Sequence, residues 1–242
     1  EGDMSFKEKV IYQIYPKSFL DTNQDGVGDL PGIEKKLPYL KRLGVDMVWL
    51  SPIYPSPQND NGNDVADYTA INPMFGTMDD FESLMATAKD NGIEIMLDMV
   101  FNHVSIEHEW FQKALAGDQK YQDYFILRDK PTDWVSKFGG NAWAPFGDTG
   151  KYYLHLYDVT QADLNWRNPE VREELFEVLR FWMDKGIKGF RFDVINVIGK
   201  DEVLIDCPEN DGKPAYTDRP IAHEFIRMMN QATYGEDAEI VT

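Results

Sequence analysis

The sequence is poor in cysteine and in long apolar stretches. Its single cysteine, Cys207, excludes a disulfide within the chain and is typical of a reducing compartment, so we expect a cytoplasmic location. No stretch approaches the roughly eighteen consecutive apolar residues that a membrane helix needs. The acidic first residues, Glu1 to Met4, do not resemble a signal peptide. We therefore expect no membrane partner.

Cations are also scarce: 24 Lys and Arg stand against 42 Asp and Glu, which gives a formal net charge of −18. Such an excess of negative charge argues against nucleic acid and against anionic lipid surfaces as partners. An anionic substrate would have to be attracted by a local basic patch that works against the overall field. We expect a small molecule as the partner.

What the chain does contain is an alternation of apolar, β-branched runs with longer segments of helical spacing. This alternation is typical of βα units around a parallel sheet. The expected strands are residues 10–15, 46–51, 93–100, 188–193 and 239–242, and the expected helices are residues 33–43, 78–91, 169–185 and 219–233. Pro169 after Asn168 predicts a capped helix start with proline at the first helical position.

The periodicity is lost between Asn102 and Trp166, over a stretch too long for an ordinary βα loop. We therefore divide the chain into a first barrel part (1–103), an inserted domain (104–167) and a continued barrel part (168–242). A complete (β/α)₈ barrel takes roughly 250 residues even without insertions. The predicted fold is α/β: the N-terminal half of a (β/α)₈ TIM barrel with a small inserted domain after the third strand. Its exposed barrel edges predict self-association.

Polar side chains follow the expected strands at their C-terminal ends, where barrel enzymes place their catalytic groups. Arg191 and Asp193 lie two apart on one strand and so share a face. The guanidinium would keep the carboxylate ionised, as a nucleophile or an electrostatic stabiliser. A buried structural ion pair is the alternative. His103, after the third strand, is expected to hydrogen-bond to substrate hydroxyls, and Asp60, after the second strand, to bind a neutral hydroxyl-rich ligand.

A further loop resembles the first nine positions of a calcium-binding loop, with oxygen ligands at alternate positions and glycine sixth. The expected ligands are Asp21, Asn23, Asp25, the Val27 carbonyl and Asp29. Gly32 stands where a calcium sensor would have its bidentate glutamate, so we expect a structural Ca²⁺ or Mg²⁺ site and no catalytic cofactor. A plain turn rich in Asp and Asn is the alternative.

The motifs together resemble the α-amylase superfamily of glycoside hydrolases along nearly the whole chain. The resemblance rests on residues 98–103, on Gln161-Ala162-Asp163-Leu164-Asn165 and on residues 189–193. The second motif, with Val194 after Asp193, is similar to the oligo-1,6-glucosidase branch. Within it, residues 56–62, 193–201 and 216–220 are most similar to enzymes that hydrolyse α,α-trehalose 6-phosphate to glucose and glucose 6-phosphate.

The resemblance implies a retaining mechanism, with two carboxyl groups about 5–5.5 Å apart. It implies that Asp193 is the nucleophile, that Arg191 keeps it ionised, and that His103 and Asp60 hold the nonreducing glucose, with Tyr157 also in the substrate-binding set. The family's acid/base glutamate follows the fifth strand, which is still being built at Thr242. We therefore expect this polypeptide alone not to turn over substrate.

The resemblance leaves two questions about the substrate. The family places tyrosine where this sequence has Asn63, so the aromatic surface that would stack on the sugar is lost. Lys200 and Arg219 are candidates for binding the phosphate, with solvated surface cations as the alternative. Two other functions stay open: an oligo-1,6-glucosidase or related α-glucosidase, and a non-catalytic barrel that acts as a binding module.

Overall fold

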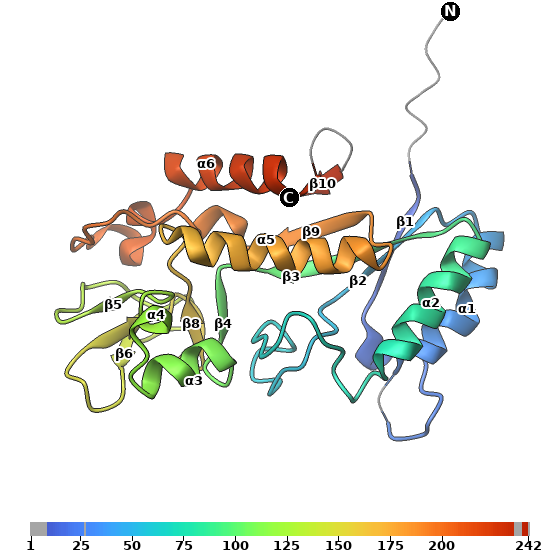
Figure 1. Ribbon diagram of the computed structural model, residues 1–242, viewed down its shortest axis with the longest axis horizontal. Coiled ribbons are helices and arrows are strands. Elements are labelled where there is room, and N and C mark those ends of the chain that lie inside the picture. Colours follow the sequence, from blue (N-terminus) through green and yellow to red (C-terminus); the bar gives the residue numbers. More distant parts are fainter. Residues whose placement is uncertain (1–8, 27, 235–238, 242) are drawn as a thin grey trace, which may run out of the picture.

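A five-stranded parallel sheet forms the centre of the computed structural model, which describes residues 9–26, 28–234 and 239–241 (Figure 1). Its strands follow one another across the sheet in chain order: β1 (Ile11–Ile14), β2 (Met47–Leu50), β3 (Glu94–Val100), β9 (Gly189–Asp193) and β10 (Glu239–Val241). Each neighbouring pair is parallel. The five predicted strands are confirmed, except that Thr242 lies outside the described residues.

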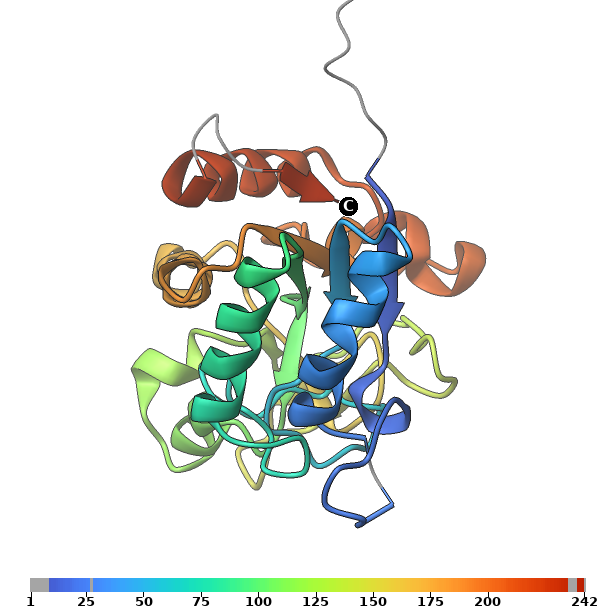
Figure 2. The ribbon, with the colours of Figure 1, turned by 90° about the vertical axis from the view of Figure 1, so that its right-hand side faces the viewer.

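Helices connect the strands, as the alternating pattern predicts. They are α1 (Leu30–Arg42), α2 (Met78–Asp90), α5 (Pro169–Asp184) and α6 (Pro220–Met229). Figure 2 shows α1 and α2 side by side along the sheet. In the described ranges, no helix is long and apolar enough to cross a membrane.

Polar caps set where these helices begin. The α1 helix starts at Leu30, earlier than the predicted residue 33, because the Asp29 side chain accepts a hydrogen bond from the Gly32 N–H at 2.9 Å. Thr77 and Asp80 form a reciprocal capping box at the start of α2. The predicted start of α5 is confirmed, with Asn168 as the cap.

The segment between β3 and α5 forms two small antiparallel sheets of its own. One pairs β4 (His103–Ser105) with β8 (Gln161–Asp163), and the other joins β5 (Leu127–Arg128), β7 (Tyr152–Leu154) and β6 (Trp143–Pro145). Two short helices, α3 (Glu109–Leu115) and α4 (Gln119–Gln122), precede the second sheet. This part lies beside the C-terminal ends of β2 and β3 in Figure 1.

Aromatic side chains from several of these elements share one core. Trp182 of α5 is fully buried and contacts Phe81 of α2 edge-on, with 5.1 Å between ring centroids. Its indole N–H donates to the Tyr68 carbonyl at 2.8 Å. Burial of a ring this large contributes on the order of 2–3 kcal/mol, so helix α5 is held firmly behind the strands that carry the polar groups.

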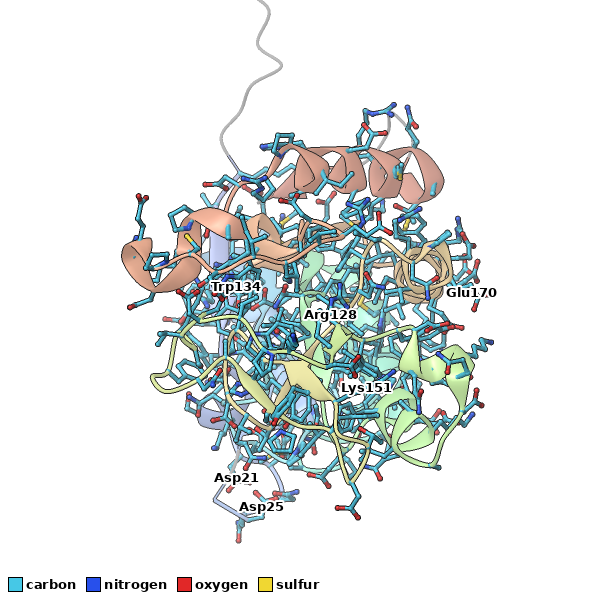
Figure 3. All side chains as sticks on the ribbon, turned by 90° about the vertical axis from the view of Figure 1, so that its left-hand side faces the viewer. Asp21, Asp25, Arg128, Trp134, Lys151 and Glu170 are labelled. Atoms are coloured by element: carbon cyan, nitrogen blue, oxygen red, sulfur yellow. The ribbon has the colours of Figure 1, made fainter. Side chains whose placement is uncertain are left out.

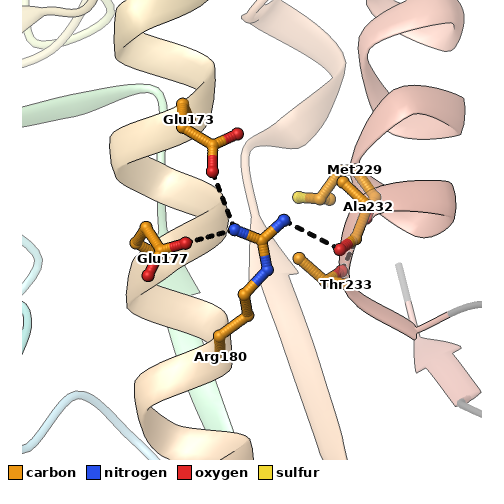
Figure 4. A network of polar contacts seen from close by, with 6 residues as sticks. All are labelled: Glu173, Glu177, Arg180, Met229, Ala232 and Thr233. Carbon is orange, nitrogen blue, oxygen red and sulfur yellow. Dashed lines mark hydrogen bonds and ion pairs between the residues drawn. The ribbon is translucent and has the colours of Figure 1, made fainter.

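Arg180 joins α5 to the segment after α6, where the regular helix gives way to a π turn at Asn230–Tyr234 (Figure 4). The predicted helix to residue 233 is therefore α-helical only to Met229. The guanidinium pairs with Glu173 at 2.8 Å and with Glu177, and it donates to the Ala232 carbonyl at 2.9 Å. These contacts tie the chain around Ala232 to helix α5.

Candidate active site

Asp98, Arg191 and Asp193 converge at the C-terminal ends of β3 and β9. The parallel register places Asp98 directly beside Arg191. Arg191 Nη1 donates to Asp98 Oδ1 at 3.2 Å and lies 3.7 Å from Asp193 Oδ1. The predicted contact of Arg191 with Asp193 is present, but the hydrogen bond goes to Asp98. One guanidinium thus faces two carboxylates. Its central carbon also lies 4.6 Å from the centroid of the Trp49 ring.

The chain turns sharply right after Asp193. Val194 has φ 50° and ψ 30°, in the left-handed region that a β-branched residue rarely adopts. This turn ends β9 and leads into the short helical turn Ile195–Val197. The Asp193 carboxylate is consequently at the edge of the sheet, where it is only partly buried.

A hollow of about 780 Å³ opens at this edge of the sheet. Its walls include Trp49, Gln58, Asn63, Asp98, Arg191 and Asp193. Asn63 therefore lies in the wall of the same hollow as Asp193, where its amide offers hydrogen bonds but no aromatic surface. A hollow of this size accommodates a ligand as large as a sugar.

Asp98 is the most perturbed carboxyl of this cluster. Burial raises its pKa to about 7, and Asp193 adds to this, whereas Arg191 opposes it. A proton on Asp98 would remove its negative charge and weaken its ion pair with Arg191. The guanidinium would then interact mainly with Asp193. The sequence places Asp98 among the polar residues at the C-terminal end of the third strand but gives it no role of its own.

Asp98→Asn is expected to remove a pH-dependent contribution to stability. The folded carboxyl has a pKa of about 7, and an unfolded Asp titrates near 3.9. The folded protein thus keeps a proton that the unfolded chain releases, so this contribution is complete below pH about 4 and is lost as the pH rises through about 7. Urea unfolding measures the free energy of unfolding of both proteins at pH 5 and pH 8. The value for the wild type, relative to that for the variant, should be higher at pH 5 than at pH 8. An equal difference at both pH values would contradict the raised pKa.

His103 is buried beside this cluster, on β4. Its Nδ1 lies 3.2 Å from the Asn102 side-chain nitrogen, and its ring centroid is 5.0 Å from that of Tyr157. Burial lowers the pKa of His103 to about 4, so the ring is neutral near pH 7. The charge of Asp193 acts to raise the pKa of His103, against the lowering by burial. His103 therefore lies near the predicted nucleophile, as the sequence suggested.

Asp60 is held in place by the β8 strand. Gln161 Nε2 donates to Asp60 Oδ2 at 3.0 Å, while Asp64 accepts the backbone N–H of Asp60 at 3.1 Å. Burial raises the pKa of Asp60, and the charge of Asp193 adds to this. Tyr157 is close enough that burial and the charges of Asp60 and Asp193 raise its pKa. The structure therefore gathers Asp60, His103, Tyr157 and Asp193 in one region.

The structure corrects the expectation that Lys200 is available to bind phosphate. Its side chain is only 3% exposed, and its ammonium makes two buried contacts. Nζ contacts Asp163 Oδ2 at 2.9 Å and Asn102 Oδ1 at 2.6 Å. The Arg219 side chain is half-buried, pairs with Asp201 at 2.9 Å and does not line the hollow. The burial of Lys200 argues against its predicted role, whereas the role of Arg219 in binding phosphate stays a prediction.

Two residues that sequence reasoning did not assign turn out to organise the site. Gln161 and Asp163 lie two apart on β8 and so point to one face of it. Gln161 holds Asp60, whereas Asp163 lies opposite His103 in the β4–β8 ladder and holds Lys200. The i, i+2 spacing of these polar residues in a buried strand was the signal that could have found them.

The loop predicted to bind a metal projects from the molecule, and Figure 3 shows Asp21 and Asp25 at its tip. Asp21 and Asn23 oxygens accept N–H groups of the same loop, including Gly26 N–H to Asp21 at 2.7 Å. Asp29 is engaged elsewhere, because it caps α1 and accepts two hydrogen bonds from Thr22. Val27 lies outside the described residues. Within the described ranges, no three His, Cys, Asp or Glu side chains are grouped as a metal site would need.

Residues 13–242 match the family model "Alpha amylase, catalytic domain". Trehalose-6-phosphate hydrolase of Bacillus subtilis is 51% identical over 95% of this chain, and that of Escherichia coli is 53% identical over 93%. Oligo-1,6-glucosidase of Parageobacillus thermoglucosidasius is 48% identical over 93% of the chain. In each case the chain spans 42% of the relative's length.

The comparison with solved structures agrees with these sequence matches. The chain superimposes on trehalose-6-phosphate hydrolase of Bacillus licheniformis with a TM-score of 0.93 and 52% identity, covering 96% of this chain and 43% of the other. This likeness confirms the predicted fold, the N-terminal part of a (β/α)₈ barrel.

Proposed function

Because the chain belongs to the α-amylase family, we propose that the protein containing it is a retaining glycoside hydrolase that cleaves α,α-trehalose 6-phosphate into glucose and glucose 6-phosphate. The observation that carries the proposal is the cluster of Asp98, Arg191 and Asp193 in a hollow beside His103. The names of the relatives at 51% and 53% identity support the substrate.

The proposed chemistry follows from the positions of these groups. The Asp193 carboxylate attacks the anomeric carbon and forms a covalent glucosyl ester. Arg191, 3.7 Å away, places a positive charge beside that carboxylate. His103 and Asp60 hold hydroxyls of the nonreducing glucose. The carboxylic acid that protonates the leaving oxygen would, by the resemblance, follow β10, and the structure describes no residue after Val241.

An oligo-1,6-glucosidase is the second candidate. One structural observation favours it: the Lys200 ammonium, proposed from the sequence as a phosphate ligand, is buried in an ion pair with Asp163. A neutral disaccharide needs no cationic subsite. The names of relatives at 45–48% identity agree with this alternative.

The two candidates are separated by the substrate that the full-length natural protein prefers. Glucose release from trehalose 6-phosphate, trehalose and isomaltose should be measured at equal concentrations. We expect trehalose 6-phosphate to be cleaved fastest, with trehalose as the control that lacks only the phosphate. Faster release from isomaltose would overturn the substrate, and no cleavage of any of them would support a binding module instead.

We also propose that the projecting loop binds a structural Ca²⁺ or Mg²⁺ through Asp21, Asn23 and Asp25. Two carboxylates and an amide oxygen within one tight turn fit a hard cation. Asp29 is better explained as the cap of α1.

Addition of Ca²⁺ is expected to raise the melting temperature, because an ion bound only by the folded state at about 100 times its Kd adds about 2.7 kcal/mol. Calorimetry of the protein with Ca²⁺ and with a chelator measures this. Asp21→Asn should abolish the increment, whereas Asp148→Asn, at another exposed loop position, should retain it. An equal increment in both variants would contradict the site.

A further inference from the structure

A buried charged network lies behind His103. Lys200 Nζ contacts Asp163 Oδ2 at 2.9 Å and Asn102 Oδ1 at 2.6 Å. The Asn102 amide nitrogen in turn lies 3.2 Å from Asp163 Oδ2 and 3.2 Å from His103 Nδ1. All four side chains are buried, so none of these contacts is shared with solvent.

The chemistry of Lys200 fixes the orientation of the Asn102 amide. An ammonium can only donate hydrogen bonds, so the amide oxygen must face it. The amide NH₂ group then faces Asp163, which only accepts, and His103 Nδ1. In the opposite orientation, the NH₂ group would face the ammonium and the amide oxygen would face the carboxylate. Donor would then meet donor and acceptor would meet acceptor in a buried site, which is unfavourable.

The amide in turn fixes the proton on the histidine ring. Because Asn102 donates to Nδ1, that nitrogen must accept, and a neutral ring then carries its proton on Nε2. Nε2 is buried and has no hydrogen-bond partner of ordinary geometry among the described residues. The nearby backbone of Asn63 acts to raise the pKa of His103, against the larger lowering by burial. The ring therefore presents an N–H that makes no hydrogen bond of ordinary geometry to the described residues.

We propose that Lys200 is a positioning residue, which holds His103 in the Nε2–H tautomer through the amide of Asn102. The inference rests on the proposed function in one respect, that the Nε2–H group is used by a sugar hydroxyl. A hydroxyl between this N–H and the Asp193 carboxylate can accept from the first and donate to the second. With the other tautomer, two acceptors would compete for the one hydroxyl proton.

The test compares the full-length wild type with Lys200→Met/Asp163→Asn, which removes both buried charges together and so avoids an unpaired one. Imidazole ¹⁵N shifts of labelled histidine report the tautomer, and His103→Gln identifies the His103 signal. We expect the Nε2–H tautomer in the wild type and a mixture of both tautomers in the double variant. A wild-type ring with its proton on Nδ1, or a double variant that keeps Nε2–H entirely, would overturn the proposal.

His108 provides a control within the same spectrum. It is buried, and its Nδ1 accepts the Trp110 backbone N–H at 3.0 Å, so it should also carry its proton on Nε2. Since a backbone group holds this tautomer, the His108 signals should not change in the double variant. A change in both histidines would indicate general disturbance of the fold and would count against a specific role of Lys200.

Kinetics supply the functional measurement. The double variant should lose roughly tenfold in kcat/KM, the effect of one misdirected hydrogen bond. Lys185→Met removes a lysine from a surface pair with Glu82 and should keep both the tautomer and kcat/KM. Unchanged kcat/KM in the double variant would overturn the functional part of the proposal. Absence of any glycosidase activity in the wild type would overturn the proposed function, while the ¹⁵N shifts would still decide the role of Lys200.

Discussion

Replacing Asp193 by asparagine is expected to reduce the rate of glycoside hydrolysis by the full-length protein roughly 10⁴-fold. The amide has nearly the same shape as the carboxylate and can keep its place beside the Arg191 guanidinium, which lies 3.7 Å away in the wild type. It is far less nucleophilic, however, and it cannot stabilise positive charge that develops on the sugar ring. The loss should therefore fall on kcat more than on KM.

The matched control is Asp148→Asn, which makes the same chemical change at an exposed loop position. It should retain wild-type rates, and both variants should unfold at similar temperatures. An Asp193→Asn variant that folds normally and keeps more than a tenth of the activity would contradict the role of Asp193 as the nucleophile.

Replacing Asp163 by alanine is expected to destabilise the protein by roughly 3–5 kcal/mol, because it leaves the Lys200 ammonium buried without its counter-ion. The Asp163 side chain is 0% exposed and that of Lys200 is 3% exposed. Asp163 also accepts the Leu156 backbone N–H at 3.0 Å, so a second buried donor loses its partner.

Glu82→Ala is the matched control for this change. Glu82 and Lys185 also lie 2.9 Å apart, but their side chains are 55% and 21% exposed. Removing one member of an exposed pair typically costs less than about 1 kcal/mol. Urea unfolding of both variants measures the two costs. Equal costs would contradict the conclusion that burial makes the Asp163–Lys200 pair matter.

Much of the barrel could be predicted from sequence because alternating strands and helices leave a strong local pattern. The start of α1 was missed because Asp29 was assigned to the metal loop, although it caps the helix through Gly32. The sequence offers both uses of this carboxylate, and only the arrangement of Thr22 and α1 around it shows which hydrogen bonds it makes.

The site was predictable where its residues follow strands and unpredictable where it depends on contacts between distant segments. Arg191 and Asp193 share a strand face, so their meeting follows from spacing alone. The burial of Lys200 depends on β4 and β8 pairing so that Asp163 faces His103, and no local pattern near Lys200 indicates this. A lysine is usually exposed, which is why the solvent-facing role was the natural expectation.

The most direct test of the proposed mechanism is to trap the covalent intermediate. The full-length protein would be incubated with a fluorinated α-glucosyl fluoride, whose fluorine slows hydrolysis of the glucosyl ester, and its peptides analysed by mass spectrometry. The mechanism predicts one glucosyl label per protein, attached to Asp193. A label on another carboxylate, or normal turnover with inversion at the anomeric carbon and no label, would contradict it.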